Sequence, residues 1–174
     1  MLYTGRGDKG DTSLFGSKER LLKDSAIIEA LGTVDELNAA VGLCRAMAKE
    51  EQFSHAAALR AVQEDLFVVQ AELAGAPKQM SDERLKRLEK EISEIESLLP
   101  PITTFFIPGE TVLGAQLDVA RTVARRAERR MVAAELSGDH AALLPYINRL
   151  SSLLYALARL ASHERGASES APSY

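Results

Sequence analysis

The chain has 174 residues, 46% of them hydrophobic and 26% charged, and its formal net charge is −4. These values indicate one globular domain and argue against long disorder and against a general nucleic-acid-binding protein. The single cysteine, Cys44, excludes a disulfide within the chain. Neither a secretory signal nor an apolar run of about 18 residues is recognisable, so we expect a cytoplasmic protein that contacts neither membrane nor nucleic acid.

An irregular arm followed by two helices is predicted for the first part of the chain. Residues 1–23 hold four glycines among threonines, serines and charged residues, which is typical of a segment without regular structure. Apolar residues recur in steps of three and four over residues 25–49 and again over 53–75. This spacing predicts two amphipathic helices, the second ending at Gly75-Ala76-Pro77.

Two further helices are predicted on either side of an irregular stretch. Ser81 is a favourable N-cap for a third helix, which the Pro100-Pro101 pair ends. Residues 102–110 break the helical pattern. A fourth helix is predicted over 111–136, and its seam of small residues should let a neighbouring helix approach closely.

The last helix is predicted over 139–164, with Gly138-Asp139 breaking the chain and capping it. Leucines cover much more than one face of this helix, which predicts neighbours on several sides and a bundle that oligomerises. Residues 165–174 are rich in Ser, Ala and Gly and are expected to fray. The sequence therefore predicts a single all-α domain over 1–174, with a five-helix bundle over 24–164.

The arm has the composition of a polyphosphate-binding segment. Gly5 to Gly10 formally match the dinucleotide fingerprint G-x-G-x-x-G, but neither a strand before them nor a helix directly after them is predicted, so that interpretation is rejected. Glycines can still turn backbone N–H groups toward one point, which suits a polyphosphate. A flexible terminus is the alternative, which composition alone favours. Further donors come from Arg6, Lys9, Thr12 and Ser13.

A second candidate feature is an arginine-rich face on the fourth helix. Arg121, Arg125 and Glu128 are spaced i, i+4 and i+7 and share one face, whereas the remaining arginines of this segment point elsewhere. The alternative is a solvated face with cations toward the helix C-terminus. Half-buried arginines need an anion, either a carboxylate or a phosphate.

Polar residues also interrupt apolar helical segments. Asp35 lies in a cluster with Thr33 and Asn38, all mediocre helix formers, which suggests that these side chains have partners. Asn148 is embedded in the apolar last helix, and a satisfied core amide is the alternative for it. Because no di-iron Glu-x-x-His pair and no nucleophile with a base at a recognisable spacing occur, an enzyme of this sequence would position charged reactants rather than attack them.

Four segments together resemble the PduO-type corrinoid adenosyltransferases, in the order in which that family has them. The matching blocks span residues 3–42, 105–132 and 146–159, nearly half of the chain. The resemblance is carried within them by Tyr3–Leu14, Lys23–Ser25 with Ala30–Ala39, Phe105–Gly109 with Ala120–Arg129, and Tyr146–Tyr155. The resemblance implies a trimer of five-helix bundles with an ATP-binding arm and active sites between subunits. It further implies transfer of the 5′-deoxyadenosyl group of ATP to the cobalt of cob(I)alamin, with release of triphosphate.

The resemblance also implies roles for individual residues. Phe105 would fill the space below the corrin ring and displace the lower axial ligand of cobalt. Asp35 and Arg121 would form an ion pair across the subunit interface. Arg125, Glu128 and Asn148 would contact ATP from the adjacent subunit. The polyphosphate and its Mg²⁺ would be held by the segment that contains Thr4, Gly5, Arg6, Gly7, Asp8, Lys9, Gly10, Ser13 and Lys23, and no metal-binding side-chain cluster is expected.

Further partners implied by the family are a corrinoid reductase and an adenosylcobalamin-dependent enzyme. The chain departs from the family at Asp118, where His is frequent, and at Gly5-Arg6, Ser17 and Glu110. Two functions of other classes stay open. One is a catalytically inactive relative that carries or senses ATP or adenosylcobalamin. The other is a helical interaction protein that presents its arginine-rich helix to an acidic partner.

One choice in the loop depends on the resemblance. Phe105 and Phe106 are adjacent and cannot both face one side, so one of them should be free to line a pocket. The family match selects Phe105. The alternative is that both rings belong to the core.

Overall fold

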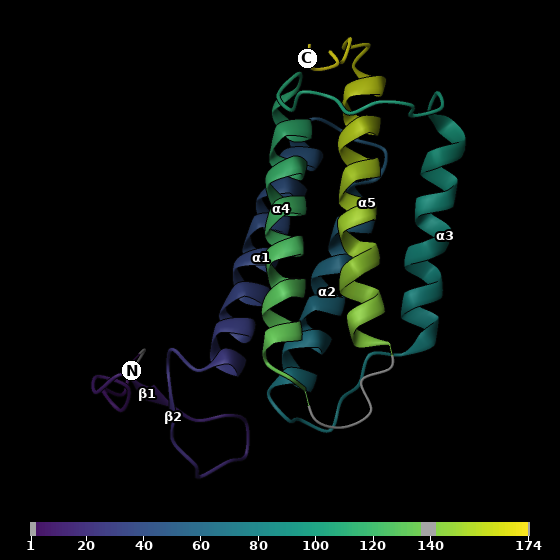
Figure 1. Ribbon diagram of the computed structural model, residues 1–174. Helices are drawn as coiled ribbons and strands as arrows, with labels where there is room; N and C mark the ends of the chain where they lie inside the picture. Colours follow the sequence, from purple (N-terminus) through teal and green to yellow (C-terminus); the bar gives the residue numbers. More distant parts are fainter. Residues whose placement is uncertain (1–2, 137–141, 174) are drawn as a thin grey trace.

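The computed structural model describes residues 3–136 and 142–173, and these ranges contain five helices (Figure 1). The predicted all-α class is confirmed, and the helix ends differ from prediction by a few residues. The fourth helix, for example, stops early because Glu135 adopts a left-handed φ of 46°. The cap predicted at Gly138-Asp139 lies outside the described residues. The helices are α1 (Ala26–Glu50), α2 (Ala56–Leu73), α3 (Asp82–Leu98), α4 (Val112–Ala133) and α5 (Leu143–Glu164).

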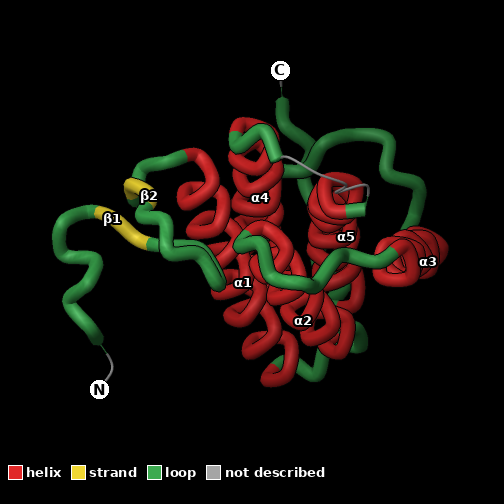
Figure 2. The backbone as a smooth tube through the Cα atoms, turned by 90° about the horizontal axis from the view of Figure 1, so that it is seen from below, coloured by secondary structure: helices red, strands yellow, loops and turns green. Residues whose placement is uncertain are grey.

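Four of the helices enclose the main core. α1 packs against α2 and α4, α4 packs against α5, and α3 packs on the outer side of α5 (Figure 2). The predicted apolar stripes face inward, and their central residues are fully buried. Among them are Leu37 and Val41 of α1, Leu59 and Leu66 of α2, Leu117 of α4 and Leu150 of α5.

Small residues bring α4 close to its neighbours, as predicted. Ala120, Ala124 and Ala127 are fully buried. A Cβ added at Gly114 would lie 3.3 Å from the Ala158 carbonyl oxygen of α5 and 2.6 Å from Thr111 Oγ1. Glycine therefore permits the close approach of α4 and α5 at this point.

The breadth of the apolar surface on α5 is accounted for within one chain. α5 lies between α4 and α3, and Leu143, Leu150 and Leu157 are fully buried without a second copy. The breadth of this helix thus gives no argument for oligomerisation. None of the helices in the described residues has the length and apolarity required to cross a bilayer.

Both ends of the chain are more ordered in structure than expected. The arm, expected to be irregular, contains a two-residue antiparallel ladder between β1 (Asp11–Thr12) and β2 (Leu21–Leu22). The tail, expected to fray, pairs with the loop that precedes α4, because the Ile107 N–H donates to the Ser170 carbonyl at 2.9 Å. Pairing of backbone groups explains both differences, and such pairing between distant segments leaves no periodic signal in the sequence.

A buried carboxylate attaches α3 to the bundle. Asp65 of α2 is 1% exposed and accepts hydrogen bonds from Arg84 and Arg87 of α3 and, at 2.8 Å, from the Tyr146 hydroxyl of α5. Burial, followed by the nearby Asp65 charge, raises the pKa of Tyr146 well above its ordinary value, so this phenol stays a donor. Three helices are thereby joined at one side chain.

We expect Asp65→Ala to lower the free energy of unfolding by about 2–3 kcal/mol, because the buried Tyr146 hydroxyl loses its acceptor while both arginines can turn to water. Urea denaturation measures this loss. The neighbouring Glu64→Ala is the control; it removes an exposed i, i+4 pair with Arg60 and a weak attraction to Arg87, and should cost about 0.5 kcal/mol or less. Equal effects of the two substitutions would contradict the role of Asp65.

Candidate functional site

A cavity of about 640 Å³ opens between α3, α4, α5 and the loop that precedes α4. We call it the α3–α5 cavity. Arg121 and Arg125 line it from α4, Tyr155 lines it from α5, and Phe105 lines it from the loop. Cationic and aromatic groups therefore converge on one concave surface, an arrangement suited to a large planar or anionic ligand.

The two adjacent phenylalanines of the loop have different environments. The Phe105 side chain is 76% exposed, whereas Phe106 is half-buried and its ring centroid lies 5.6 Å from the Arg159 guanidinium carbon. The alternative that both belong to the core is therefore wrong. One aromatic anchors the loop, and the other is presented to the cavity.

The floor of the cavity is a buried charge network that sequence reasoning missed. Asp118, 4% exposed, accepts a 2.8 Å hydrogen bond from Arg121 Nε and a second, short one from Arg159 of α5. Arg159 is equally buried and also pairs with Glu169 of the tail at 2.7 Å. Burial raises the pKa of Glu169, and the Arg159 charge opposes this shift.

Two charged residues next to buried leucines are the signal that could have revealed this network. Asp118 follows Leu117 and Arg159 precedes Leu160, and both leucines are buried. A buried charge requires a partner of opposite sign. The departure from the family at Asp118 is thus a buried structural carboxylate that binds both arginines.

The arginines of α4 separate into two groups, as their spacing predicted. Arg121 and Arg125 face the α3–α5 cavity, whereas Arg126 pairs with Glu36 of α1 at 2.5 Å and Arg130 pairs with Glu29 at 3.4 Å. The anion required by half-buried Arg121 is Asp118 of the same chain.

Asn148 and Glu128 meet at the surface beside this arginine face. Asn148 Nδ2 donates to Glu128 Oε1 at 2.8 Å. Asn148 is exposed, so the alternative of a satisfied core amide is wrong. The resemblance implies that Arg125, Glu128 and Asn148 contact the ATP of an adjacent subunit, and the structure brings the last two of these together.

The glycine-rich arm folds back on itself through two cationic side chains. Lys23 Nζ donates to the Gly7 carbonyl, and the Lys23 N–H to the Gly10 carbonyl, both at 2.9 Å. Arg20 pairs with Asp11 at 2.6 Å, and its hydrogen bond lowers the pKa of Asp11. Gly10, with φ of 84°, takes a conformation that favours glycine.

The other predicted residues of the arm lie around this turn. The Thr4 hydroxyl accepts from the Arg6 N–H at 3.4 Å, and the Asp8 N–H donates to the Gly5 carbonyl at 3.3 Å. Lys9 is exposed. Charged and backbone donors are thus available at the surface of the arm.

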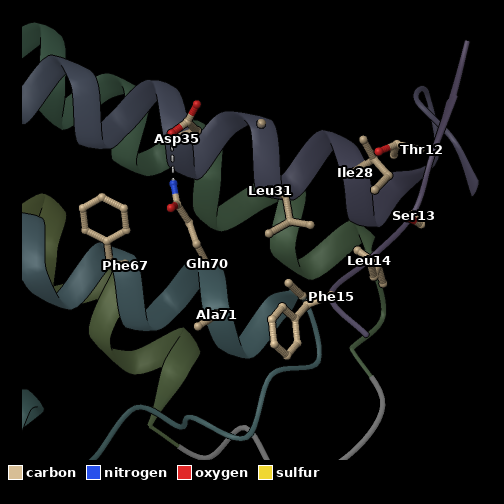
Figure 3. A pocket seen from close by; sticks show the side chains of 12 residues that line it. Thr12, Ser13, Leu14, Phe15, Ile28, Leu31, Asp35, Phe67, Gln70 and Ala71 are labelled. Atoms are coloured by element: carbon tan, nitrogen blue, oxygen red, sulfur yellow. Dashed lines mark hydrogen bonds between the residues drawn. The ribbon is translucent and has the colours of Figure 1, made fainter. Parts of the chain in front are cut away.

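A second cavity, of about 580 Å³, lies between the arm, α1 and α2, and we call it the α1–α2 groove (Figure 3). Ser13 and Phe15 of the arm and Phe67 of α2 line it. Asp35 of α1 points into the groove and accepts a 3.3 Å hydrogen bond from Gln70 of α2.

Within one chain, the predicted residues therefore form two separate half-sites. Asp35 and, from the arm, Ser13 line the α1–α2 groove, whereas Arg121, Arg125 and Phe105 line the α3–α5 cavity. The glycine-rich turn of the arm lies outside both linings. Asp35 and Arg121 do not pair with each other here, since their partners are Gln70 and Asp118.

The described residues contain no group of three or more His, Cys, Asp and Glu side chains that could hold a metal ion. Mg²⁺ is usually held by one or two carboxylates together with substrate phosphates. The arm places the Asp8 carboxylate near hydrogen-bond donors suited to phosphate. It therefore fits that mode of Mg²⁺ binding and does not fit a site built from protein ligands alone.

Comparison with known proteins gives consistent matches. A family model described as cobalamin adenosyltransferase matches residues 2–161. The corrinoid adenosyltransferase PduO of Citrobacter freundii is 44% identical over 94% of this chain and 50% of that protein. The human corrinoid adenosyltransferase MMAB is 36% identical over 97% of this chain and 71% of that protein. The chain spans about half the length of the first PduO relatives that it matches.

Solved structures match over nearly the whole chain. A variant of the PduO-type ATP:corrinoid adenosyltransferase from Lactobacillus reuteri, complexed with cobalamin and ATP, superimposes with a TM-score of 0.91 at 30% identity, covering 99% of this chain and 96% of that one. Another variant of the same protein, complexed with ATP, gives a TM-score of 0.90 at 31% identity and covers 99% of this chain and 100% of that one.

Proposed function

The chain belongs to the cobalamin adenosyltransferase family, and we propose that it transfers the 5′-deoxyadenosyl group of ATP to the cobalt of cob(I)alamin and releases triphosphate. The observation that carries this proposal is Phe105, an exposed aromatic ring held at the mouth of a cavity that two arginines line. A protein that only bound ATP would have no use for such a ring. A planar corrin above it gives the ring a function.

The two substrates are assigned to different half-sites. The arm, from Thr4 to Lys23, would hold the polyphosphate through its backbone N–H groups and cationic side chains, with Mg²⁺ carried on the phosphates. Arg125, Glu128 and Asn148 would contact the nucleotide from an adjacent copy of the chain. Phe105 would occupy the lower face of the corrin.

The chemistry requires positioning and electrostatic stabilisation, not a protein nucleophile. Co(I) attacks the ribose C5′ of ATP, the C5′–O bond breaks, and the electron pair leaves with triphosphate. The protein must hold the cobalt, C5′ and the leaving oxygen in line. It must also stabilise the negative charge that develops on the triphosphate, for which Lys9, Lys23 and Arg125 are suited. The absence of a recognisable nucleophile–base pair in the sequence agrees with this chemistry.

We further propose that the active protein is a homotrimer with one site between each pair of subunits. Support comes from the separation of Ser13 and Asp35 in the α1–α2 groove from Phe105, Arg121 and Arg125 in the α3–α5 cavity, which leaves each half incomplete in one chain. Docking of the groove of one copy against the cavity of the next would join the halves. A cytoplasmic location and exchange with a corrinoid reductase and an adenosylcobalamin-dependent enzyme belong to the same proposal.

The activity is tested by supplying MgATP with chemically reduced cobalamin. We expect the visible spectrum of adenosylcobalamin to appear and triphosphate to accumulate in equal amount, because the reaction produces one of each. Omission of cobalamin should abolish triphosphate release. Orthophosphate as the sole phosphate product would identify an ordinary ATPase and contradict the proposal.

The subunit interface is tested by a double-mutant cycle on Asp35 and Arg121. In a trimer, Asp35→Ala and Arg121→Ala should each weaken assembly, and the double variant should be less impaired than the sum, with a coupling of about 0.5–3 kcal/mol. Light scattering at micromolar concentration and activity provide the two measurements. The Glu36–Arg126 pair, which forms within the chain, is the matched control and should show no coupling in trimer dissociation. A monomeric wild-type protein, or strict additivity, would refute the interface.

The role of Phe105 is tested by Phe105→Ala. Because the ring is exposed, the free energy of unfolding should change by less than about 0.5 kcal/mol. Turnover should fall much more with cob(II)alamin and a mild reductant than with pre-reduced cob(I)alamin, since only the former requires loss of the lower axial ligand. Ile107→Ala, a change in the same loop outside the cavity lining, is the control and should retain both activities. Equal losses in the two assays would remove Phe105 from the activation step.

A further inference from the structure

The loop that carries Phe105 has very little packing of its own. Between residues 101 and 110, all of which are described, Phe106 alone is not exposed. The orientation of Phe105 must therefore come from the residues that follow it. Two contacts are available: the Phe106 ring lies against Arg159, and the Ile107 N–H donates to the Ser170 carbonyl at 2.9 Å.

Both contacts depend on the guanidinium of Arg159. Glu169 immediately precedes Ser170 and pairs with Arg159 Nη1 at 2.7 Å. Arg159 Nη2 is bound by Asp118 of α4, which fixes the guanidinium from the opposite side. Loop, tail, α4 and α5 thus meet at one side chain that is only 4% exposed.

The surroundings of Arg159 favour a fixed guanidinium. The Tyr155 ring centroid lies 5.0 Å from the guanidinium carbon of Arg159, and the Phe106 ring also contacts this group. Aromatic rings suit the planar arginine group. The network of Arg121, Arg159, Asp118 and Glu169 is balanced, with two cations and two anions. Such balance is what permits burial of these charges.

The loop nevertheless has room to move if these contacts are lost. A cavity of about 190 Å³ lies between the loop, α5 and the tail, lined in part by Phe106, Arg159 and Glu169. Phe106 is therefore held by specific contacts rather than by close packing on all sides. Removal of one contact should allow the ring to shift into this space.

We propose that Arg159 is a positioning residue for Phe105, and that the tail, through Glu169 and Ser170, holds the loop against it. Arg159 acts through Phe106 and the backbone of Ile107, without itself contacting the corrin. The structural part of this inference concerns the loop in the free protein. Its catalytic consequence rests on the proposed adenosyltransferase function.

The test uses three variants of the full chain. Glu169→Ala removes one partner of Arg159 without altering a helix. Arg159→Lys keeps the charge but loses the planar fork and the stacking of a planar group on the aromatic rings. Ser168→Ala is the matched control, since Ser168 is exposed and directly precedes Glu169. Urea denaturation shows whether each variant folds.

Hydrogen exchange of the loop in the free protein is the first readout. The Ile107 amide should exchange at least about tenfold faster in Glu169→Ala and Arg159→Lys. Its acceptor is the Ser170 carbonyl, and both variants weaken the Arg159–Glu169 pair that holds this part of the tail. It should keep the wild-type rate in Ser168→Ala. Unchanged exchange in a folded Glu169→Ala protein would overturn the proposal, whatever the activity of the wild type.

Activity is the second readout and separates this proposal from the proposed function. Glu169→Ala should reduce turnover with cob(II)alamin and a mild reductant, in the same sense as Phe105→Ala, and should largely keep turnover with pre-reduced cob(I)alamin. A loop that loosens while both activities stay at the wild-type level would overturn the catalytic role of this network. A wild-type protein with no transferase activity would refute the proposed function, and the exchange result would still decide the positioning of the loop.

Discussion

The buried carboxylate of Asp118 is the constraint on which the geometry of the candidate site depends. It lies on an apolar seam of α4 and is surrounded by Arg121 and Arg159, so its charge is stabilised only while α4 and α5 keep their register. Loss of either arginine would leave charge in an environment that solvates it poorly. The same pairing fixes Arg121 at the cavity floor and Arg159 beneath the loop. One ion cluster thus sets the floor and one edge of the cavity.

A second buried carboxylate, Asp65, holds α3, which forms another wall of the cavity. Asp65 of α2 binds Arg84 and Arg87 and so attaches α3, which packs on the outer side of α5 and away from the four-helix core. Apolar burial on α3 is limited, with Leu88 and Ile95 as its buried residues. α3, one wall of the α3–α5 cavity, therefore depends in part on a charge cluster, whereas the core enclosed by α1, α2, α4 and α5 depends on aliphatic packing.

The division between what could and could not be predicted from the sequence follows the range of the interactions. Helices and their buried stripes repeat every three or four residues, so local periodicity was sufficient to predict them. Asp118 and Arg159 lie 41 residues apart, and Asp65 and Tyr146 lie 81 apart, so no local pattern pairs them. The choice between Phe105 and Phe106 came from family resemblance, because their sequence context is the same. The pattern alone left Asn148 open between a core amide and a contact residue, because its helix is apolar on either side.

The arrangement of charges on α4 suggests why the two half-sites are kept on different faces of one chain. Arg126 and Arg130 are neutralised by glutamates of α1, on the side toward the arm. Arg125 is exposed in the α3–α5 cavity, where a phosphate could approach it. In the proposed trimer, the anionic nucleotide held by one arm would meet the arginines of the next copy, so triphosphate charge would itself complete the interface. Substrate binding and assembly would then stabilise each other, because each supplies the counter-charge that the other lacks.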